Sequence, residues 1–501
     1  MSSAIRLIFT ASFFIGIALC LIWFPWYALG AIIIGLTAVG FYDITQTKHT
    51  ILRNYPVVGH LRFILEGIAP EIHQYFIEND LDGKPISRNQ RSYIYQRAKL
   101  ANRTHPFGTE LDLQENHASW MRHSIYPAKR LAEFPTVTIG GKDCLKPYKA
   151  SLMNISAMSY GALSANAVTA LNKAAKHGGF YHNTGEGGIS SYHLQGGDIV
   201  YQIGTGYFGC RDDEGNFSPD KFVNSAAHDE VKMIEIKISQ GAKPGHGGVL
   251  PAAKNTEIIA AIRGVKPYTD VLSPPGHTAF SNPAGLMQFI KQLRELSGGK
   301  PVGFKLCIGS KQEFIDICKA MVETGIKPDF ITVDGAEGGT GAAPIVFSDH
   351  VGMPWENALI FVADTLIKYD LKKDIRLITS SKIITGFDIM KALCMGADLC
   401  NSARGMMIAL GCIQALECHN NRCPTGVTTH NPRLMKGLVV EEKWKRVVNY
   451  HDETLNDFLD IFAASGHAEL SELNRSIIYK QLNYKENCFE DLYPTPGVRL
   501  N

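Results

Sequence analysis

Eight short apolar runs, separated by segments with the composition of helices, constrain the fold of this chain more than any other feature. The runs are residues 152–158, 179–185, 199–204, 233–239, 302–308, 329–335, 375–381 and 397–403. Most are apolar along their whole length, as strands buried on both faces of a parallel sheet are. Helical sequences lie between several of them, at 164–178, 311–325 and 386–396. Eight such strands over about 250 residues predict a (β/α)8 TIM barrel of the α/β class, with 240–300 as an insertion.

The segments that follow these strands are rich in glycine and poor in bulky side chains. They include MSYGALS (158–164), NTGEGG (183–188), QGAKPGHGG (240–248), DGAEGGTGAAP (334–344), SSKIITG (380–386) and NSARGMM (401–407). In a barrel of this type the C-terminal ends of the strands carry the active site, and a phosphate often binds after strands seven and eight. Glycine lets the backbone approach a ligand closely, and backbone N–H groups bind phosphate. The loops therefore predict a phosphate-bearing cofactor at this end of the barrel.

Three cysteines lie close together in LGCIQALECHNNRCPTG, residues 410–426, at a C-x5-C-x4-C spacing. The chain has eleven cysteines, an odd number without the spacing of a small disulfide-bonded domain, so a reducing compartment is expected. Thiolate ligands favour zinc or an iron–sulfur cluster. Zinc prefers four ligands, often as C-x2-C pairs, and here His419 is the candidate for the fourth. Packing without a ligand is the third interpretation of Cys412, Cys418 and Cys423.

Two uncharged apolar runs near the N-terminus, at 7–24 and 26–42, each approach the length of a membrane-spanning helix. Pro25 separates them, aromatic residues lie on both sides of it, and basic residues lie before the first run and after the second. This pattern predicts a transmembrane hairpin with both ends in the cytoplasm. A single re-entrant anchor is the alternative, whereas a signal peptide is disfavoured because the apolar region is long. The expected location is the inner (cytoplasmic) membrane, with the catalytic domain in the cytoplasm.

Four regions follow from these patterns. They are a transmembrane hairpin at 1–48, a helical connector at 49–150, the barrel with its cysteine loop at 151–435, and a C-terminal helical extension at 436–501. The formal net charge is +2, so no polyanionic partner is indicated and nucleic-acid binding is not expected. No NADPH-binding domain is expected in this chain.

The order of these motifs resembles the FMN-binding domain of glutamate synthases. The series MSYGALS, NTGEGG, QGAKPGHGG, SPPGH, DGAEGGTGAAP and LGCxxxxxCxxxxCPTGV carries the resemblance, which extends from about residue 150 to 435. The whole chain is similar to standalone, often membrane-tethered proteins of the FMN-binding glutamate synthase family. The resemblance implies bound FMN and a [3Fe–4S] cluster held by Cys412, Cys418 and Cys423.

The resemblance also implies roles for residues at the strand ends. The backbone that would line one face of the flavin ring belongs to Met158, Ser159, Tyr160 and Gly161. Gln202 would lie near the flavin, and Gln240 and Lys305 would contact the ring, where a cation stabilises the reduced, anionic flavin. The candidates on the phosphate side are Gly338, Gly339, Thr340, Ser381, Gly386 and Gly405.

Glu186, in NTGEGG, is the candidate for acid–base catalysis or for handling ammonia, and the alternative is a loop carboxylate that caps a helix. Lys305 could also bind a carboxylate of 2-oxoglutarate, or it could simply be paired with a carboxylate of the protein. Gln240 completes the predicted catalytic set. Lys243 and His246 are weaker candidates for substrate binding.

The resemblance implies an oxidoreductase acting on CH–NH2 donors. Such an enzyme condenses ammonia with 2-oxoglutarate and reduces the resulting 2-iminoglutarate to L-glutamate. No glutaminase domain is expected in this chain, so ammonia and electrons would come from solution or from partners such as a ferredoxin or a reductase subunit. The alternatives are a membrane-associated flavin and iron–sulfur electron-transfer protein, an imine reductase acting on another substrate, and a non-catalytic scaffold.

Overall fold

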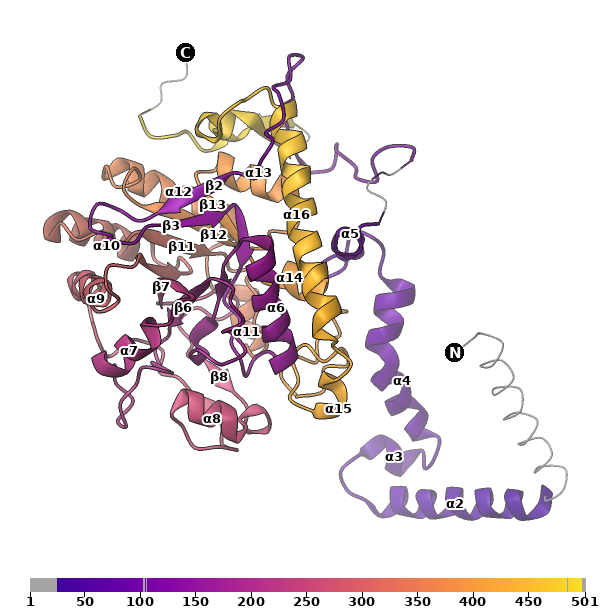
Figure 1. The fold of residues 1–501 in the computed structure, drawn as a ribbon. Helices are drawn as coiled ribbons and strands as arrows, with labels where there is room; N and C mark the ends of the chain where they lie inside the picture. The colour runs from indigo at the N-terminus through magenta and orange to yellow at the C-terminus, as the bar shows by residue number, and fades with distance from the viewer. Residues whose placement is uncertain (1–24, 102–103, 105, 484, 498–501) are drawn as a thin grey trace. The chain divides into compact units, whose positions relative to one another are not determined.

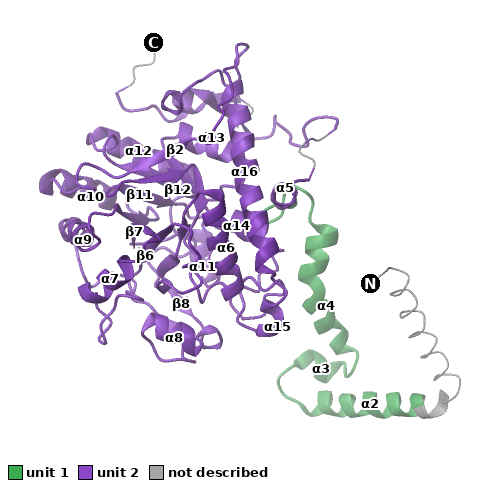
Figure 2. Ribbon diagram, in the orientation of Figure 1, with its two compact units in different colours: residues 1–88 green, residues 89–501 purple. Residues whose placement is uncertain are grey.

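The computed structural model describes residues 25–101, 104, 106–483 and 485–497, and the chain divides into two compact units. Unit 1 comprises residues 1–88 and unit 2 comprises residues 89–501 (Figure 2). Unit 2 contains all of the strands and all of the candidate site residues, so the fold that positions the site is described for unit 2.

Eight parallel strands of unit 2 form a closed barrel and confirm the predicted (β/α)8 fold (Figure 1). They are β4 (Met153–Ile155), β5 (His182–Asn183), β6 (Ile199–Ile203), β7 (Val231–Lys237), β10 (Val302–Leu306), β11 (Phe330–Asp334), β12 (Arg376–Ser381) and β13 (Leu399–Ser402). Each strand pairs with the next in this order, and β13 pairs with β4 to close the barrel. Nearly all of their residues are buried, which explains why the runs are apolar along their whole length.

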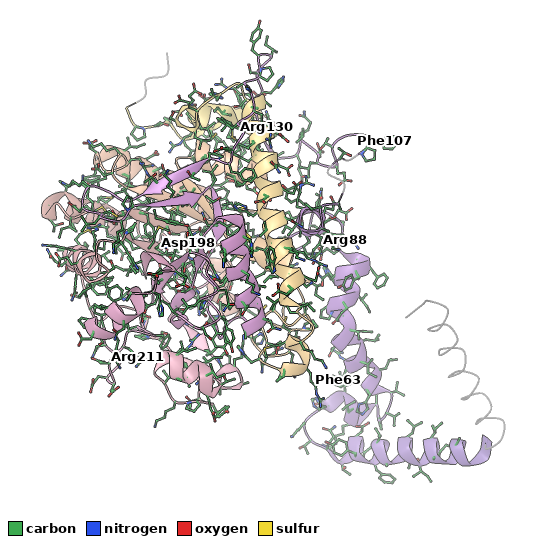
Figure 3. All side chains as sticks on the ribbon, viewed as in Figure 1. Phe63, Arg88, Phe107, Arg130, Asp198 and Arg211 are labelled. Carbon is green, nitrogen blue, oxygen red and sulfur yellow. The ribbon has the colours of Figure 1, made fainter. Side chains whose placement is uncertain are left out.

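An antiparallel hairpin, β2 (Thr136–Ile139) and β3 (Tyr148–Ser151), covers the N-terminal end of the barrel. One hydrophobic cluster joins this hairpin to residues at or near the starts of the strands, namely Ile139, Ala150, Tyr181, Val200, Met233, Phe330, Ile378 and Leu399. The Tyr148 hydroxyl also donates to Oδ2 of Asp198 at 2.9 Å. Figure 3 shows that side chains occupy the space between the strands and the surrounding helices. The polar groups of the candidate site therefore lie toward the C-terminal ends of the strands.

The helices between the strands begin and end at residues with the expected capping chemistry. In α6 (Ala165–Gly178) the Ser164 side chain accepts from the N–H of Ala167, and Gly179 ends the helix with a φ of +68°. A capping box of Thr385 and Asp388 begins α13 (Gly386–Cys394). Together with α10 (Lys311–Thr324), these elements confirm the three predicted helices. The other barrel helices are α7 (Pro219–Ala226), α9 (Pro283–Leu296), α12 (Trp355–Lys368) and α14 (Arg404–Leu410).

The segment 240–300 contains both an insertion and a barrel helix. The insertion holds β8 (Val249–Leu250), the 3-10 turn η3 (Ala252–Lys254), α8 (Glu257–Arg263) and β9 (Val271–Leu272). The last part of the segment is α9, which contacts α10 and β10 on the outside of the barrel. A further short helix, α11 (Ile345–His350), follows β11.

The flanking regions of unit 2 contain strands as well as the expected helices. They include α5 (Arg88–Ala98), which begins at the boundary between the units, β1 (Ser119–Met121), α15 (Pro432–Met435), α16 (Val440–Ala464), β14 (Ile478–Leu482), β15 (Lys485–Cys488) and α17 (Phe489–Leu492). β1, β14 and β15 form one antiparallel sheet, so the two flanking regions meet. The long helix α16 packs on α6, α13 and α14.

Unit 1 contains α2 (Pro25–Thr45), α3 (Thr50–Asn54), α4 (Gly59–Ile72) and a π-helical turn, η1 (His73–Ile77). Asp43, at the end of α2, accepts hydrogen bonds from the N–H of Val57 at 2.8 Å and from Nε2 of His60 at 2.9 Å. The second apolar run lies in α2, but none of the helices in the described residues is sufficiently long and apolar to span a membrane. The first run, 7–24, lies outside the described residues, so the structure gives the predicted transmembrane hairpin no support.

Candidate active site

A buried carboxylate, Glu235 on β7, lies inside the barrel and accepts three hydrogen bonds. Its Oε1 accepts from Nδ2 of Asn183 at 2.8 Å and from Nε2 of Gln202 at 2.7 Å. Its Oε2 accepts from Oγ1 of Thr332 at 2.6 Å. The residue is 1% exposed, and the three donors replace the water that a buried carboxylate would otherwise lose. The predicted Gln202 thus belongs to a network centred on Glu235, which the sequence analysis missed.

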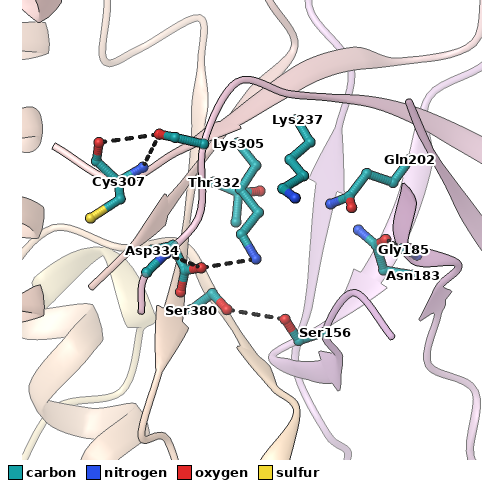
Figure 4. A network of polar contacts seen from close by, with 12 residues as sticks. Ser156, Asn183, Gly185, Gln202, Lys237, Lys305, Cys307, Thr332, Asp334 and Ser380 are labelled. Atoms are coloured by element: carbon teal, nitrogen blue, oxygen red, sulfur yellow. Dashed lines mark hydrogen bonds and ion pairs between the residues drawn. The ribbon is translucent and has the colours of Figure 1, made fainter. Parts of the chain in front are cut away.

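Lys305, on β10, is paired with Asp334 at the end of β11 (Figure 4). Its Nζ lies 3.1 Å from Oδ2 of Asp334, and the same oxygen accepts from the N–H of Gly241 at 3.0 Å. Burial lowers the pKa of Lys305, but the carboxylates of Asp334 and Glu235 outweigh burial, so the pKa is raised. Lys305 is therefore a charged ammonium inside the barrel, and it has the carboxylate partner that the sequence analysis considered as an alternative.

Glu186 follows β5, in the 3-10 turn η2 (Gly185–Gly187), and forms an ion pair with Lys237 at the end of β7. The distance from Oε1 of Glu186 to Nζ of Lys237 is 2.7 Å. Two glycines leave room for Glu186, because a Cβ at Gly204 or Gly248 would lie 2.5 Å or 2.8 Å from one of its carboxylate oxygens. Burial raises the pKa of Glu186, but the surrounding cations outweigh burial and lower it. Glu186 is therefore an ionised carboxylate at neutral pH.

Two further cations, Lys243 and Arg263, contribute to the low pKa of Glu186. Nζ of Lys243 donates to the carbonyl of Gly247 at 3.3 Å. Burial and the nearby Lys237 lower the pKa of Lys243, and burial lowers the pKa of Arg263 to about 10. Three cations thus surround one carboxylate, which leaves a local excess of positive charge suited to an anionic ligand. Lys243 is one of the weaker candidates predicted from the sequence, whereas Lys237 and Arg263 were not predicted.

A cavity opens beside Glu186 at the C-terminal end of the barrel. Its lining includes Glu186, Thr205, Lys237, Gln240, His246 and Pro275. The structure thereby brings Glu186, Gln240 and His246 to the same cavity. A cation, a carboxylate and an amide therefore line this cavity, which suits a polar ligand.

The loop of Met158, Ser159, Tyr160 and Gly161 packs directly on the loop that carries Glu186. A Cβ at Gly185, which has a φ of +64°, would lie 2.7 Å from the N atom of Ser159. Nη2 of Arg263 donates to the carbonyl of Tyr160 at 3.3 Å, and Nε2 of His430 lies 2.9 Å from the carbonyl of Gly161. The predicted flavin-facing backbone is therefore held between Arg263 and His430, which follows the cysteine segment.

The six candidates on the phosphate side do not form one group. Gly339 lies against Arg404, since a Cβ there would be 3.1 Å from Nε of that side chain. Arg404, which the sequence analysis missed, donates to the carbonyl of Glu337 at 2.5 Å. Ser381 is buried at the end of β12, and its hydroxyl has no hydrogen-bond partner among the described residues. The structure thus places an unsatisfied hydroxyl at the end of β12 and a cation at the start of α14, beside the loop that contains Gly338, Gly339 and Thr340.

Gly386 and Gly405 have packing contacts that account for the absence of a side chain. A Cβ at Gly386 would lie 2.5 Å from the backbone N of Phe458 on α16. A Cβ at Gly405 would lie 2.6 Å from the hydroxyl of Tyr450 and 2.7 Å from that of Ser402. Both glycines therefore allow α16 to approach the barrel, a function that requires no ligand.

In the C-x5-C-x4-C segment, the thiols of Cys418 and Cys423 lie close enough to Cys412 to act on its pKa. Burial, with help from these two thiols, raises the pKa of Cys412 to about 12. Burial also raises the pKa of Cys423, but hydrogen bonds from Thr425 and other donors outweigh it, so that pKa is lowered. Among the described residues, no group of three or more His, Cys, Asp or Glu side chains is arranged to hold a single metal ion.

Side chains from two distant elements hold the backbone of this cysteine segment. The Tyr95 hydroxyl, on α5, donates to the carbonyl of Cys412 at 2.7 Å. Nζ of Lys254, in η3, donates to the carbonyl of Ala162 at 2.7 Å and to that of Cys418 at 3.2 Å. Burial lowers the pKa of Lys254 to about 8. The Tyr95–Cys412 and Lys254–Cys418 contacts could not be predicted from sequence, because each joins residues more than 160 positions apart.

Comparison with known proteins finds relatives over most of the chain. A family profile described as the conserved region in glutamate synthase matches residues 127–468. The glutamate synthase large subunit-like protein YerD of Bacillus subtilis is 40% identical over 490 residues, covering 88% of this chain and 93% of that protein.

Two other relatives are longer than the matched region. The archaeal glutamate synthase (NADPH) of Methanocaldococcus jannaschii is 35% identical over 64% of this chain, which spans 60% of that protein. The ferredoxin-dependent glutamate synthase of Cyanidium caldarium is 35% identical over 63% of this chain, which spans 21% of that protein. The closed barrel and the profile match agree, and the chain belongs to the glutamate synthase family, a family of oxidoreductases that act on CH–NH2 donors.

Proposed function

We propose that this protein is an FMN-dependent oxidoreductase that reduces 2-iminoglutarate, formed from 2-oxoglutarate and ammonia, to L-glutamate. The observation that carries this proposal is the excess of positive charge from Lys237, Lys243 and Arg263 around Glu186. Charge-assisted hydrogen bonds from lysine and arginine are the usual means of binding carboxylates, and 2-oxoglutarate has two. Relatives named glutamate synthase, which are 35% identical to this chain over the matched regions, support the proposal.

The residues at the C-terminal end of the barrel fit an FMN. The unsatisfied hydroxyl of Ser381 and the Arg404 side chain beside Gly339 would hold its phosphate, which needs donors and positive charge. The Lys305 ammonium, whose pKa is raised, would stabilise negative charge on a reduced flavin ring. When bound, FMN would supply the hydride for the reduction.

Glu186 and its neighbours would handle the proton and the substrate carboxylates. An ionised Glu186 that faces the cavity can accept a proton from ammonium, which releases nucleophilic ammonia. The protonated Glu186 can then donate this proton to the nitrogen of the imine. Lys237, which lines the cavity, would bind a substrate carboxylate, and Lys243 and Arg263 would add positive charge nearby. The Gln240 side chain, on the wall of the same cavity, adds an amide that can donate or accept.

The three cysteines fit a [3Fe–4S] cluster better than a single zinc ion. Zinc prefers four ligands, often in C-x2-C pairs, and this segment has three cysteines without such a pair. Cysteine thiolates are the usual ligands of iron–sulfur clusters. Cys412, Cys418 and Cys423 would be its ligands, and Cys423, with the lowered pKa, is the most ready to bind as a thiolate.

Electrons are proposed to come from outside the chain, from a ferredoxin or a reductase subunit. The Methanocaldococcus relative is named for NADPH and the Cyanidium relative for ferredoxin, so the donor differs within the family. The location at the inner membrane stays a prediction that rests on the sequence of residues 1–48.

An anaerobic reoxidation experiment tests the proposal. The full chain is purified, its flavin and iron are measured, and it is reduced with dithionite. Flavin reoxidation only when 2-oxoglutarate and ammonium are added together, with L-glutamate detected by mass spectrometry, is the expected result. Flavin and iron without this reoxidation would favour an electron-transfer protein or an imine reductase with another substrate. A chain that binds no flavin would contradict the proposal.

A further inference from the structure

A buried lysine lies between the two segments to which the flavin and the cluster are assigned. Lys254 is 2% exposed, and the hydrogen-bond acceptors of its Nζ in the described part of the chain are two backbone carbonyls. The first, of Ala162, belongs to the MSYGALS loop that would face the flavin. The second belongs to Cys418. Lys254 is therefore a direct link between both proposed redox sites.

In the described part of the chain, no carboxylate forms an ion pair with the Lys254 ammonium. A buried ammonium is unfavourable unless an anion accompanies it, because two carbonyl dipoles replace only part of its hydration. The groups that would offer negative charge are the ionised thiols of Cys418 and Cys423, while Arg263 adds a like charge nearby. A cluster ligated by three thiolates is anionic, and it gains one more negative charge on reduction. The site thus has a fixed cation where a reducible anion is expected.

We propose that Lys254 is a positioning residue that fixes the Cys418 segment against the Ala162 loop and raises the reduction potential of the [3Fe–4S] cluster. The proposal rests on the cluster assignment under the proposed function. In the step concerned, an external one-electron donor is oxidised and the cluster takes up the electron. The Lys254 ammonium, at short range in a buried site, makes that uptake more favourable. No proton transfer from Lys254 is involved.

The test is a mediated redox titration of the full chain, followed by EPR and visible spectra under anaerobic conditions. The variants are Lys254→Met, which removes charge and hydrogen bonds, and Lys254→Gln, which keeps an N–H donor without the charge. Both are expected to lower the equilibrium constant for cluster reduction by about tenfold or more, equivalent to about 59 mV for one electron. Lys254→Arg keeps the charge and is expected to retain a potential close to that of the wild type.

Arg422→Gln is the matched control. The Arg422 side chain precedes Cys423 in the sequence and is 76% exposed, so the substitution removes an exposed positive charge near the same cysteine. Water and salt screen an exposed charge, so its effect is expected to be well under half that of Lys254→Gln. The proposal would be overturned if Lys254→Met and Lys254→Gln kept full iron content and the wild-type reduction potential of the cluster. It would also be overturned if Arg422→Gln shifted that potential as much as they do. If Lys254→Met binds no iron, Lys254→Gln and Lys254→Arg decide in the same way. A wild-type chain without iron would overturn the cluster assignment itself, and this proposal with it.

Discussion

Nζ of Lys237 lies 2.7 Å from Oε1 of Glu186, and this ion pair joins the end of β7 to the loop after β5. Lys237 is the last residue of a strand, so its backbone is fixed by the barrel, while Glu186 lies in a turn between glycines. The pair lines the cavity and is enclosed by Gly204 and Gly248. It therefore sets the charge at the position where the substrate is proposed to bind.

Replacing Glu186 by Gln is expected to reduce ammonia-dependent glutamate formation by about 100-fold or more, because general acid–base groups contribute at least this factor. The amide keeps the size of the side chain but cannot take a proton at neutral pH. The measurement is kcat with saturating 2-oxoglutarate and ammonium, with flavin content as the check on folding. Glu214→Gln, at an exposed position, is the control. Wild-type kcat in Glu186→Gln would exclude a proton-transfer role.

Replacing Lys237 by Met is expected to raise the pKa of Glu186. Burial acts to raise this pKa, and Lys237 is the main group that lowers it, so burial has the larger effect once the cation is removed. Glu186 must be ionised to accept a proton, so the acidic limb of the pH profile of kcat/KM should move to higher pH. Lys232→Met is the matched control, because Lys232 lies on the same strand and is paired with Asp198 at 3.7 Å, away from Glu186. An acidic limb that stays in place would separate Glu186 from the titrating group.

Replacing Gln202 by Leu is expected to destabilise the barrel by about 2 kcal/mol, because Oε1 of the buried Glu235 loses one of its two donors. The measurement is the midpoint of urea-induced unfolding, followed by flavin fluorescence and circular dichroism. A double-mutant cycle with Glu235→Gln isolates the interaction. The cost of Gln202→Leu should be smaller in the Glu235→Gln background, where no buried charge is left short of donors. Equal costs in both backgrounds would mean that the hydrogen bond contributes nothing specific.

Replacing any one of Cys412, Cys418 and Cys423 by Ser is expected to remove the bound iron and to leave FMN bound, because the flavin contacts lie in other loops. Iron and sulfide analysis with the visible spectrum measures the first effect, and fluorescence of released flavin measures the second. Cys144→Ser is the control, since the Cys144 thiol is partly exposed and donates to the carbonyl of Gly299. Full iron content in all three variants would refute the cluster.

The barrel could be predicted from the sequence because its strands are buried on both faces, which forces runs that are apolar throughout. Glu235 and Lys237 were not predicted, although their spacing offered a signal. Because they are two positions apart on β7 (Val231–Lys237), they must lie on the same face of the strand. Charges that are tolerated there need partners inside the barrel, and Asn183, Gln202 and Glu186 provide them.

Other parts of the site depend on contacts that have no local pattern. Arg263 reaches Tyr160 from α8 in the insertion, and Lys254 reaches Cys418 across 164 residues of sequence. The strands β14 and β15 were missed for the same reason, because β14 pairs with β1 at the other end of unit 2. Such contacts depend on how the insertion and the flanking regions fold back on the barrel, which neither periodicity nor capping residues specify.

The glycine contacts separate packing from cofactor binding in a way that substitution can test. Gly386→Ala would place a Cβ 2.5 Å from the backbone N of Phe458, which cannot move without displacing α16. It is therefore expected to cost about 1–3 kcal/mol of stability and to leave the Kd for FMN unchanged once the protein is folded. Gly339→Ala would meet the flexible Arg404 side chain at 3.1 Å, so stability should change little while FMN binding weakens.

Urea unfolding of the apoprotein and FMN titration by fluorescence quenching measure the two quantities separately. Gly309→Ala is the control, because a Cβ at that position has nothing within 4 Å. The opposite pattern, with weaker FMN binding in Gly386→Ala and lower stability in Gly339→Ala, would assign the phosphate to the N-terminus of α13. Since Gly386 lies against α16 and Gly339 lies beside a cation, the contacts favour Arg404 and the loop after β11 as the phosphate site.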